Sequence, residues 1–383
     1  MIRISHIIGT PIMGGVQIGI RLLSSHDNQK NIERNVICLY PQYENFNGIF
    51  DKENNIDVYY CVKFFKGPLF RPYHFWKKVR NLLGLITFPI RFYFLLKKIK
   101  PDILINSEPK LVLVQVLISK FMSIPYILSM EGEIKFGNYS IFNKYIFKNI
   151  FIISNHKSTI DKNFLKIRNI EINKNAEIPI ISVVPDLIDF PLEKKYSENK
   201  IIQIGTIGRL TWEKNFQQIV EITKLINETT KLKFKISIIG SGSELSKLKK
   251  IISNNRLEKQ IILLGGQSYL KTIQFLSELD IYIQTSVSEG GPRTVKEAMA
   301  SFLPVITTNV GDVAEVIDDG VDGFISPINN SEYFAKILIR LLQLDKEERF
   351  QIGLKARTKI LENYSMKEVY NKHLKLVRYL IKK

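Results

Sequence analysis

The chain has 383 residues, of which 45% are hydrophobic and 24% are charged, and its net charge at pH 7 is +18. This length exceeds one typical hydrophobic core, so two domains are expected. Cys38 and Cys61 form neither a disulfide framework nor a metal-ligand spacing, which excludes a disulfide-rich scaffold and favours a cytoplasmic chain. The N-terminus is too quickly polar for a signal peptide, and no apolar run approaches the ~18 residues of a spanning helix.

Strands and helices alternate through the first half of the chain. Arg3–Ile8 predicts a first strand, and Gly14 and Gly15 open the helix Val16–Ser25. Such a helix start has room for an anion, although a plain tight turn is an equal alternative. Further strands are predicted at Asn35–Tyr40, Asp57–Tyr60, Asp102–Asn106, Pro125–Ser129, Phe151–Ser154 and Ile181–Val184, with a helix at Pro109–Met122. This alternation is typical of a doubly wound parallel sheet.

The positive charge is concentrated in Val62–Lys100. This segment holds ten Lys or Arg, ten aromatic residues and no Asp or Glu, and we expect it to be a helix interrupted near Pro89. It could be a nucleic-acid surface, a membrane-interface surface or a solvated helix face over a core. No paired Cys/His ligands, RNP-type string or basic-plus-heptad run accompanies the charge, so nucleic acid is not the expected partner. The segment favours an anionic membrane.

A polar and charged stretch, Pro191–Lys200, is typical of a hinge. It divides a first domain, residues 1–190, from a second domain, residues 191–364. A last basic helix follows in residues 365–383. In the second domain, strands are predicted at Ile201–Ile207, Phe234–Gly240, Ile261–Leu264, Ile281–Gln284 and Pro304–Thr308, with helices at Glu244–Ser253, Glu332–Leu344 and Lys346–Glu362.

Gly290, Gly291 and Pro292 separate the strand Ile281–Gln284 from a new helix. Proline near a helix start loses no donor, because the first-turn N–H groups have no partner within the helix. The two glycines allow the backbone to approach a bound group closely. The pattern therefore predicts an anion-binding helix end close to Pro292.

Two glutamates accompany this helix start, Glu289 just before it and Glu297 about 8 Å further along the helix axis. Two carboxylates could hold hydroxyl groups at two points of one ligand. The E-x7-E spacing alone is a weak signal, but it continues for about 38 residues with Ala298-Met299-Ala300, Pro304-Val305-Ile306, Gly311, Glu315, Gly320 and Gly323. The whole string resembles the signature of the retaining, nucleotide-sugar-dependent glycosyltransferases of family 4.

The resemblance implies the GT-B fold, an α/β arrangement of two doubly wound, Rossmann-like parallel-sheet domains facing a cleft. In that family the last helix usually packs back on the first domain. Gly208-Arg209-Leu210 followed by Lys214 is similar to the motif whose Arg and Lys hold the nucleotide diphosphate. Two cations suit that role because the leaving diphosphate gains negative charge. A strand-end Arg paired with a nearby acid, beside a surface Lys, is the alternative.

Arg209, Lys214 and Glu289 are accordingly expected to be catalytic, with Glu289 on the donor-sugar hydroxyls. The residues expected to bind substrates are Gly14, Gly15, Gly208, Gly290, Gly291, Pro292 and Glu297, the last one on the ribose. The expected reaction transfers a sugar with retention from a nucleotide diphosphate donor, a UDP-sugar by preference, without a metal or cofactor. The expected acceptor is a glycan or a lipid-linked molecule of bacterial surface polysaccharide synthesis, at the inner face of the cell membrane. A catalytically inactive scaffold and another GT-B enzyme, such as an epimerase or phosphorylase, are the alternatives.

One position departs from the family. After the strand Pro125–Ser129, where many members have a catalytic-site histidine, this chain has Glu131. A carboxylate only accepts hydrogen bonds, so Glu131 would need a donor group on the sugar, or a proton of its own, or would act as the base for the acceptor. A helix cap without a role in the reaction is the alternative. His156, after the next strand, is the other candidate for this contact.

Overall fold

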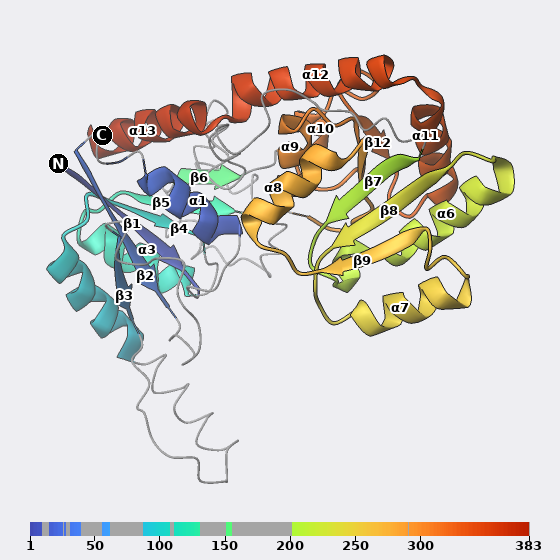
Figure 1. Cartoon of the computed structure of the whole chain (residues 1–383). Coiled ribbons are helices and arrows are strands. Elements are labelled where there is room, and N and C mark those ends of the chain that lie inside the picture. The colour runs from blue at the N-terminus through green and yellow to red at the C-terminus, as the bar shows by residue number, and fades with distance from the viewer. Residues whose placement is uncertain are drawn as a thin grey trace, which may run out of the picture. The chain divides into compact units, whose positions relative to one another are not determined.

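The computed structural model describes residues 1–9, 15–25, 27, 31–39, 56–61, 87–107, 111–130, 151–154, 201–289 and 291–382 (Figure 1). The chain divides into two compact units, one of Met1–Ile181 with Val369–Lys383 and one of Ser182–Glu368. The predicted boundary at residues 190 and 191, and the predicted strand Ile181–Val184, lie outside the described residues.

Unit 1, the unit that begins at Met1, is built on a six-stranded parallel sheet, as the sequence predicts. Its strands are β1 (Ile2–Ile8), β2 (Ile32–Cys38), β3 (Asp57–Tyr60), β4 (Ile103–Asn106), β5 (Tyr126–Met130) and β6 (Phe151–Ser154). Their order is β3-β2-β1-β4-β5-β6, and every neighbouring pair is parallel. β4 and β5 are mostly apolar because helices cover both faces of such a sheet, whereas β1 also contains Arg3, Ser5 and His6.

Helical residues 87–99 and α3 (Val112–Phe121) cover one face of this sheet, where Phe88, Phe92 and Val116 join its core. On the other face, Ile20 of α1 (Gly15–Ser24) packs against β1 and β2. The predicted interruption near Pro89 stays a prediction, because residues 62–86 lie outside the described residues and Pro89 is in the first turn of the described helical residues 87–99, where proline is tolerated. Phe88 and Phe92 lie on either side of Pro89 with their rings stacked at 5.4 Å, so the buried face of the helix is continuous there.

Unit 2, which holds the rest of the chain, has a second six-stranded parallel sheet. Its strands are β7 (Ile202–Ile207), β8 (Phe234–Ile239), β9 (Ile261–Gly265), β10 (Ile281–Gln284), β11 (Val305–Thr308) and β12 (Phe324–Ser326). The order is β12-β11-β10-β7-β8-β9, again parallel throughout. The order reverses between β7 and β10, and this is where doubly wound sheets bind ligands.

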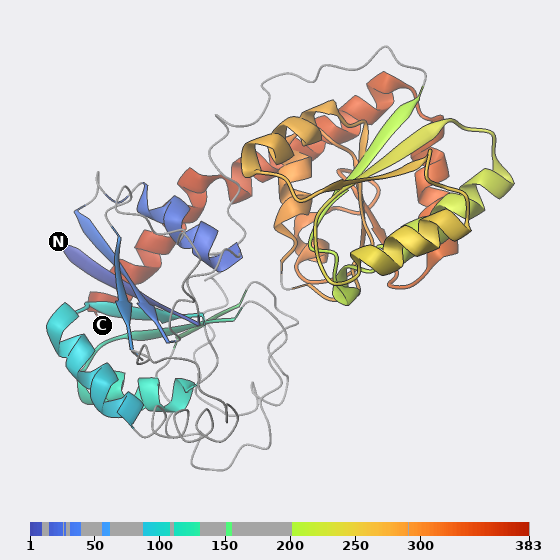
Figure 2. The same cartoon turned by 60° about the horizontal axis from the view of Figure 1, so that its bottom comes forward.

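Helices cover both faces of the second sheet (Figure 2). One layer contains α6 (Gln217–Thr229), α7 (Leu245–Asn254) and α11 (Ser331–Gln343), and the other contains α8 (Tyr269–Glu278), α9 (Arg293–Ala300), α10 (Val313–Val316) and α12 (Lys346–Tyr364). Along β10, Ile281 and Ile283 join the first layer while Tyr282 joins the second, as the two-residue period of a strand requires. Among the described helices, none has both the length and the apolar content to cross a bilayer.

The last helix, α13 (Met366–Lys382), is bound to the sheet of unit 1 by a buried polar cluster. Arg34 of β2 donates two hydrogen bonds to Asp27, at 2.6 and 2.9 Å, and Asp27 also accepts one from Tyr370 at 3.1 Å. The same guanidinium donates to Nε2 of His6 at 2.7 Å and to Nε2 of His373 at 3.3 Å. Since arginine can only donate, both imidazoles are neutral acceptors.

This cluster should make the docking of α13 sensitive to pH. Burial, and then the charge of Arg34, hold the pKa values of His6 and His373 well below the usual range. Above the unfolded pKa of about 6.5 each histidine is neutral in both states, and the free energy of unfolding has its full value. Below that pH the unfolded state takes up a proton that the folded state does not, so the free energy of unfolding falls by about 1.4 kcal/mol per pH unit for each histidine. Between pH 7.5 and 5.5 we expect faster opening of α13 by amide hydrogen exchange, and His373→Gln should lessen that pH dependence. Equal pH dependence in both proteins would contradict this.

Candidate functional site

The loops that follow β7 and β10 meet at the carboxyl edge of the second sheet. The loop after β7 contains a single 3₁₀ turn, η4 (Trp212–Lys214). The backbone N–H of Val287 donates to the carbonyl of Glu213 at 2.8 Å, and the hydroxyl of Thr285 donates to the carbonyl of Asn215 at 3.1 Å. These contacts fix the two loops against each other at the topological switch point of the sheet.

The loop after β7 is also fixed from its other side, by the loop after β8. Gly208 N–H donates to the carbonyl of Ile239 at 3.0 Å, and Leu210 N–H donates to that of Ser241 at 2.9 Å. A Cβ atom on Gly240 would lie 1.9 Å from the carbonyl oxygen of Gly208. Only glycine therefore allows the two backbones to come this close.

Lys214 and Glu289 form an ion pair across this edge. The ammonium of Lys214 donates to Oε1 of Glu289, and the two side chains are only 15% and 13% exposed. The hydroxyl of Ser286, at the end of β10, donates to the same oxygen at 2.7 Å. The sequence predicts separate roles for Lys214 and Glu289 and gives no role to Ser286. Nothing in a lone serine three residues before a glutamate signals this contact.

The second predicted cation, Arg209, is placed differently. Its side chain is 78% exposed, and its Nη2 atom lies 3.5 Å from Oε1 of Glu213 in the same loop. The loop therefore offers one nearly buried cation, Lys214, and one exposed cation that can move toward a ligand. The pairing of Arg209 with a nearby acid matches the alternative interpretation of this residue, and its role in binding stays a prediction.

The helix start after β10 lies next to Glu289 in the chain. Pro292 is the N-cap of α9, so the helix begins one residue later than Pro292 itself, at Arg293. Among the described residues no side chain caps this end. The N–H of Val295 donates to the carbonyl of Pro292 at 3.2 Å, so the N–H groups of Arg293 and Thr294 are the candidates for binding an anion. Gly291 is described just before this end, whereas Gly290 lies outside the described residues.

Glu297 is buried within α9 and paired with Arg293. The Nε atom of Arg293 donates to Oε1 of Glu297 at 2.7 Å, and the guanidinium lies 5.5 Å from the ring centre of Tyr269. Burial raises the pKa of the Glu297 carboxyl, while the charge of Arg293 opposes that shift. The i,i+4 spacing of this pair could have been found in the sequence.

A second buried pair joins α9 to the loop after β11. Lys296 donates to Asp312, both side chains are nearly inaccessible, and the ammonium lies 5.3 Å from the ring centre of Tyr364. Burial lowers the pKa of Lys296, and Asp312 opposes that shift. Breaking a buried pair of this kind typically costs about 3–5 kcal/mol. The pair thus fixes the helix that presents Glu297.

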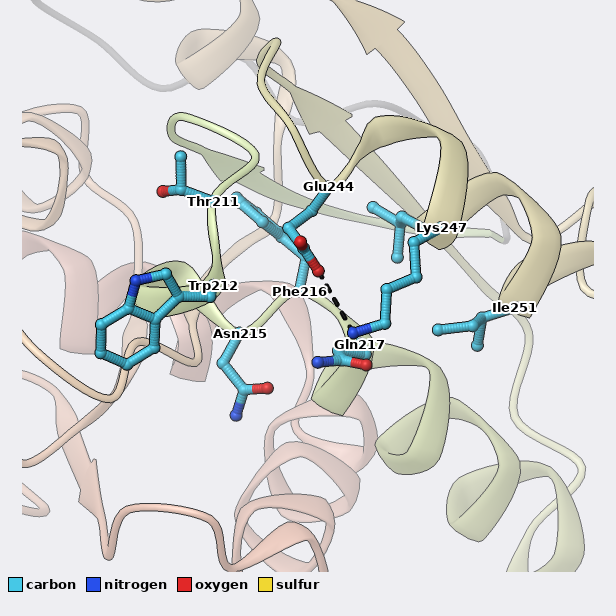
Figure 3. A pocket seen from close by; sticks show the side chains of 9 residues that line it. Thr211, Trp212, Asn215, Phe216, Gln217, Glu244, Lys247 and Ile251 are labelled. Atoms are coloured by element: carbon cyan, nitrogen blue, oxygen red, sulfur yellow. Dashed lines mark ion pairs between the residues drawn. The ribbon is translucent and has the colours of Figure 1, made fainter.

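A groove lies beside η4, between the start of α6 and α7 (Figure 3). The exposed indole of Trp212 lies at one side of it, and an ion pair between Glu244 and Lys247, at 3.3 Å, lies at the other. The lining residues are Thr211, Trp212, Asn215, Phe216, Gln217, Glu244, Lys247, Leu248 and Ile251. Lys214 is not one of them, so the groove is separate from the Lys214–Glu289 pair.

The predicted site residues of unit 1 are mostly not described. Gly14, Glu131 and His156 lie outside the described residues, and Gly15 is the first residue of α1. Glu131 directly follows the last residue of β5, Met130. Gly208, Lys214, Glu289, Gly291 and Pro292 belong to loops at one edge of the second sheet, with Arg209 exposed beside them and Glu297 buried on α9.

Residues 189–359 match the family model of glycosyl transferases group 1. This segment contains β7 to β12 and the whole of the edge just described. This segment is similar to a group 1 glycosyltransferase domain.

Curated relatives of the group 1 domain include enzymes of bacterial polysaccharide synthesis. The amylovoran biosynthesis glycosyltransferase AmsK of Erwinia amylovora is 26% identical over 197 residues, which cover 50% of this chain and 48% of that protein. The poly(ribitol-phosphate) α-N-acetylglucosaminyltransferase of Staphylococcus aureus is 27% identical over 238 residues, covering 62% of this chain and 41% of that protein. The chain spans about half the length of the curated relatives it matches.

Solved structures show the GT-B fold for the chain. A glycosyltransferase of Rickettsia africae ESF-5 matches with a TM-score of 0.74 and 18% identity, covering 100% of this chain and 99% of that one. HepE of Anabaena in complex with UDP matches with a TM-score of 0.73 and 15% identity, covering 99% and 100%. At these identities the likeness shows the fold alone.

The close approach of Gly240 to Gly208 can be tested by adding one methyl group. Gly240→Ala should displace the loop that carries Lys214 and destabilise unit 2 by about 2–3 kcal/mol, in the range of overpacking substitutions. Gly266→Ala is the matched control, because its Cβ would meet only the Ser241 side chain at an ordinary 3.5 Å. The two variants would be compared by urea unfolding. Equal stability of Gly240→Ala and Gly266→Ala would show that the backbone at Gly208 can shift to accept the added methyl group at little cost.

Proposed function

We propose that the chain transfers a sugar from a nucleoside diphosphate donor, with retention of configuration, to a glycan or lipid-linked acceptor. The observation that carries the proposal is the edge of the group 1 domain where Lys214, Glu289 and the N-terminal end of α9 come together. A cation, a carboxylate and free backbone donors are the groups that a sugar diphosphate requires. The cation and the backbone donors suit phosphate, and the carboxylate suits sugar hydroxyls.

In the proposed reaction the bond between the sugar C1 and the β-phosphate oxygen breaks, and its electron pair leaves with the phosphate. The acceptor oxygen forms the new bond to C1 on the same face, and its proton passes to the leaving phosphate. Lys214, Arg209 and the first-turn N–H groups of α9 stabilise the charge that develops on the phosphate. Glu289 holds the sugar hydroxyls and Glu297 the ribose. In this proposal the two cations provide the neutralisation, so the reaction needs no metal.

The relatives support the choice of substrates. AmsK acts in amylovoran biosynthesis, and HepE has been crystallised with UDP and glucose. We therefore propose a UDP-sugar donor and an acceptor from bacterial surface polysaccharide synthesis at the inner face of the membrane. Glu131 remains proposed as a contact to the donor sugar, in place of the histidine of other members. In the alternative proposal Glu131 is the acceptor base, and the proton then passes to Glu131 instead of the leaving phosphate.

The rival proposal is a scaffold that keeps the fold without turnover. The intact set of Arg209, Lys214, Glu289 and Glu297 argues against it. Incubating the protein with a panel of nucleotide sugars separates the two, since even slow hydrolysis releases free nucleotide. An epimerase would instead convert the donor sugar without releasing nucleotide.

Removing either proposed phosphate cation should strongly slow the transfer. Loss of one donor to a developing charge costs about 3 kcal/mol, so Lys214→Ala and Arg209→Ala should each reduce kcat by roughly a hundredfold. Arg209→Lys should also fail, because a point charge does not replace a bidentate fork. Nucleotide release from the donor measures this, with circular dichroism as the control for folding. Near-normal turnover of either alanine variant would contradict the assignment.

Access to a lipid-linked acceptor is supported by an apolar and basic surface on unit 1. Two neighbouring helices, residues 87–99 and α3, expose large apolar side chains, and Tyr93 of the first contacts Phe121 of the second with ring centres 6.1 Å apart. The exposed apolar residues are Ile90, Phe94, Leu113, Leu117 and Phe121, and the exposed basic residues between them are Arg91, Lys97, Lys98 and Lys120.

This surface, the 87–121 surface, has the composition of a membrane-interface helix pair. Residues 62–130 contain only two acidic residues, Asp102 and Glu108. An apolar ridge flanked by cations fits an anionic bilayer, into which the ridge would insert while the cations contact headgroups. The predicted membrane segment Val62–Lys100 is described only from residue 87 onward, and α3 extends the proposed surface beyond it.

Charge removal tests this surface. Each basic residue near an anionic membrane contributes about 1 kcal/mol, so Arg91→Gln, Lys97→Gln and Lys98→Gln together should weaken liposome binding by roughly a hundredfold. Co-sedimentation with vesicles of phosphatidylglycerol and phosphatidylcholine measures it, and salt should have the same effect.

The matched control removes three exposed lysines of α7, Lys247, Lys249 and Lys250, which lie in unit 2. That variant should bind vesicles as the unaltered protein does. If vesicle binding does not depend on the fraction of anionic lipid, or if both triple variants lose the same amount of binding, the 87–121 surface is instead a solvated helix face.

A further inference from the structure

The cation assigned to the diphosphate and the carboxylate assigned to the donor sugar are bonded to each other. Lys214 and Glu289 are both nearly buried, so the pair is not a loose surface contact that solvent screens away. A phosphate that takes the ammonium of Lys214 must therefore compete with a carboxylate already bound to it. Binding of the diphosphate and orientation of Glu289 are thus one coupled event.

The hydrogen bonds of Glu289 show what would remain after that exchange. Lys214 and Ser286 both donate to Oε1, and among the described residues no partner is assigned to Oε2. When Lys214 turns to a phosphate, Ser286 keeps its hydrogen bond to the carboxylate. Glu289 would then still be held by one contact, with its other acceptor positions open to sugar hydroxyls.

Ser286 is itself held independently of Lys214. It is fully buried at the end of β10, and its carbonyl accepts a hydrogen bond of 2.5 Å from the hydroxyl of Thr308 at the end of β11. Its position is therefore fixed by two strands of the sheet and not by the loop after β7. This is what a residue needs if it is to hold Glu289 while Lys214 moves.

We propose that the donor diphosphate displaces Lys214 from Glu289, and that Ser286 is the positioning residue that then keeps the carboxylate aimed at the donor sugar. The proposal rests on the proposed function and gives its site an order of events. The Lys214–Glu289 ion pair then opposes binding of the diphosphate. Only a diphosphate that carries its sugar replaces the interactions that both residues lose when the pair separates. The sugar supplies hydroxyl donors to Glu289 in exchange for the ammonium that the phosphate removed.

A nucleoside diphosphate without its sugar should bind this site less tightly than the intact donor. It takes Lys214 but leaves Glu289 facing a phosphate with only Ser286 as a donor, and like charges at short range repel. The spent nucleotide is therefore held more weakly than the intact donor. Return of Lys214 to Glu289 would favour its release after each transfer.

The first experiment measures binding of UDP, GDP and ADP to the full chain by calorimetry. Glu289→Gln removes the competing charge with almost no change of shape, so the best-bound nucleotide should bind this variant about three- to tenfold more tightly than the unaltered protein. Transfer by the same variant should be lost. Weaker or unchanged nucleotide binding by Glu289→Gln would overturn the competition.

The second experiment tests the positioning role of Ser286. Ser286→Ala should bind the nucleoside diphosphate as before, while the KM for the sugar nucleotide rises and kcat falls, each by about three- to tenfold. In the Glu289→Ala background, where Ser286 has no side-chain acceptor left at this position, Ser286→Ala should have no further effect on the affinity for the sugar nucleotide measured by calorimetry. Ser326→Ala is the matched control, since this serine is equally buried at the end of β12 and, within the described part of the chain, its hydroxyl donates to the carbonyl of Pro327.

A purely structural role for Ser286 would give additive losses in the double variant, or the same losses in Ser286→Ala and Ser326→Ala, and either result would overturn the assignment. If none of the three nucleotides binds the unaltered protein and no sugar nucleotide is turned over, the proposed function itself fails. Binding and turnover by the unaltered protein with the wrong pattern among the variants would refute the displacement alone.

Discussion

The parallel pairing of β7 with β10 is the constraint on which the candidate site depends. It brings two segments that are distant in the sequence to the same edge of one sheet, with Ile281 beside Ile204. Because both strands run in the same direction, the loops that leave them emerge on the same side. Lys214 and Glu289 meet for this reason, and an antiparallel pairing of the same strands would place them at opposite ends.

Glycine and buried charge then set the details of that edge. The close approach of Gly240 to the carbonyl of Gly208 lets the loop after β7 pack directly against the loop after β8, which places η4 beside the loop after β10. On the other side, the Lys296–Asp312 pair anchors α9, so the helix end after Glu289 has a fixed place. Both loops are supported from outside the pair they form, which allows the pair itself to exchange partners without loss of the fold.

The sequence was sufficient for the features that depend on local patterns. Apolar runs of strand length between glycines and helical segments predict both sheets, and Gly290 to Pro292 predicts the helix end within one residue. Contacts across the sheet were out of reach, because neither Lys214 nor Ser286 carries a local signal for Glu289. The sequence does not reveal the partners of His6 either, since Arg34 and His373 lie on other elements.

The membership of α13 in unit 1 has a consequence for how the protein is made. Unit 1 is discontinuous, and its last helix is separated from its sheet by the whole of unit 2. During synthesis, the sheet of β1 to β6 leaves the ribosome with Arg34 and His6 lacking Tyr370 and His373 as neighbours. Unit 2 is one continuous stretch and can complete its core first. The first half of the chain therefore finishes folding last, and an incomplete chain exposes the buried charge of Arg34 to the quality-control proteases of the cell.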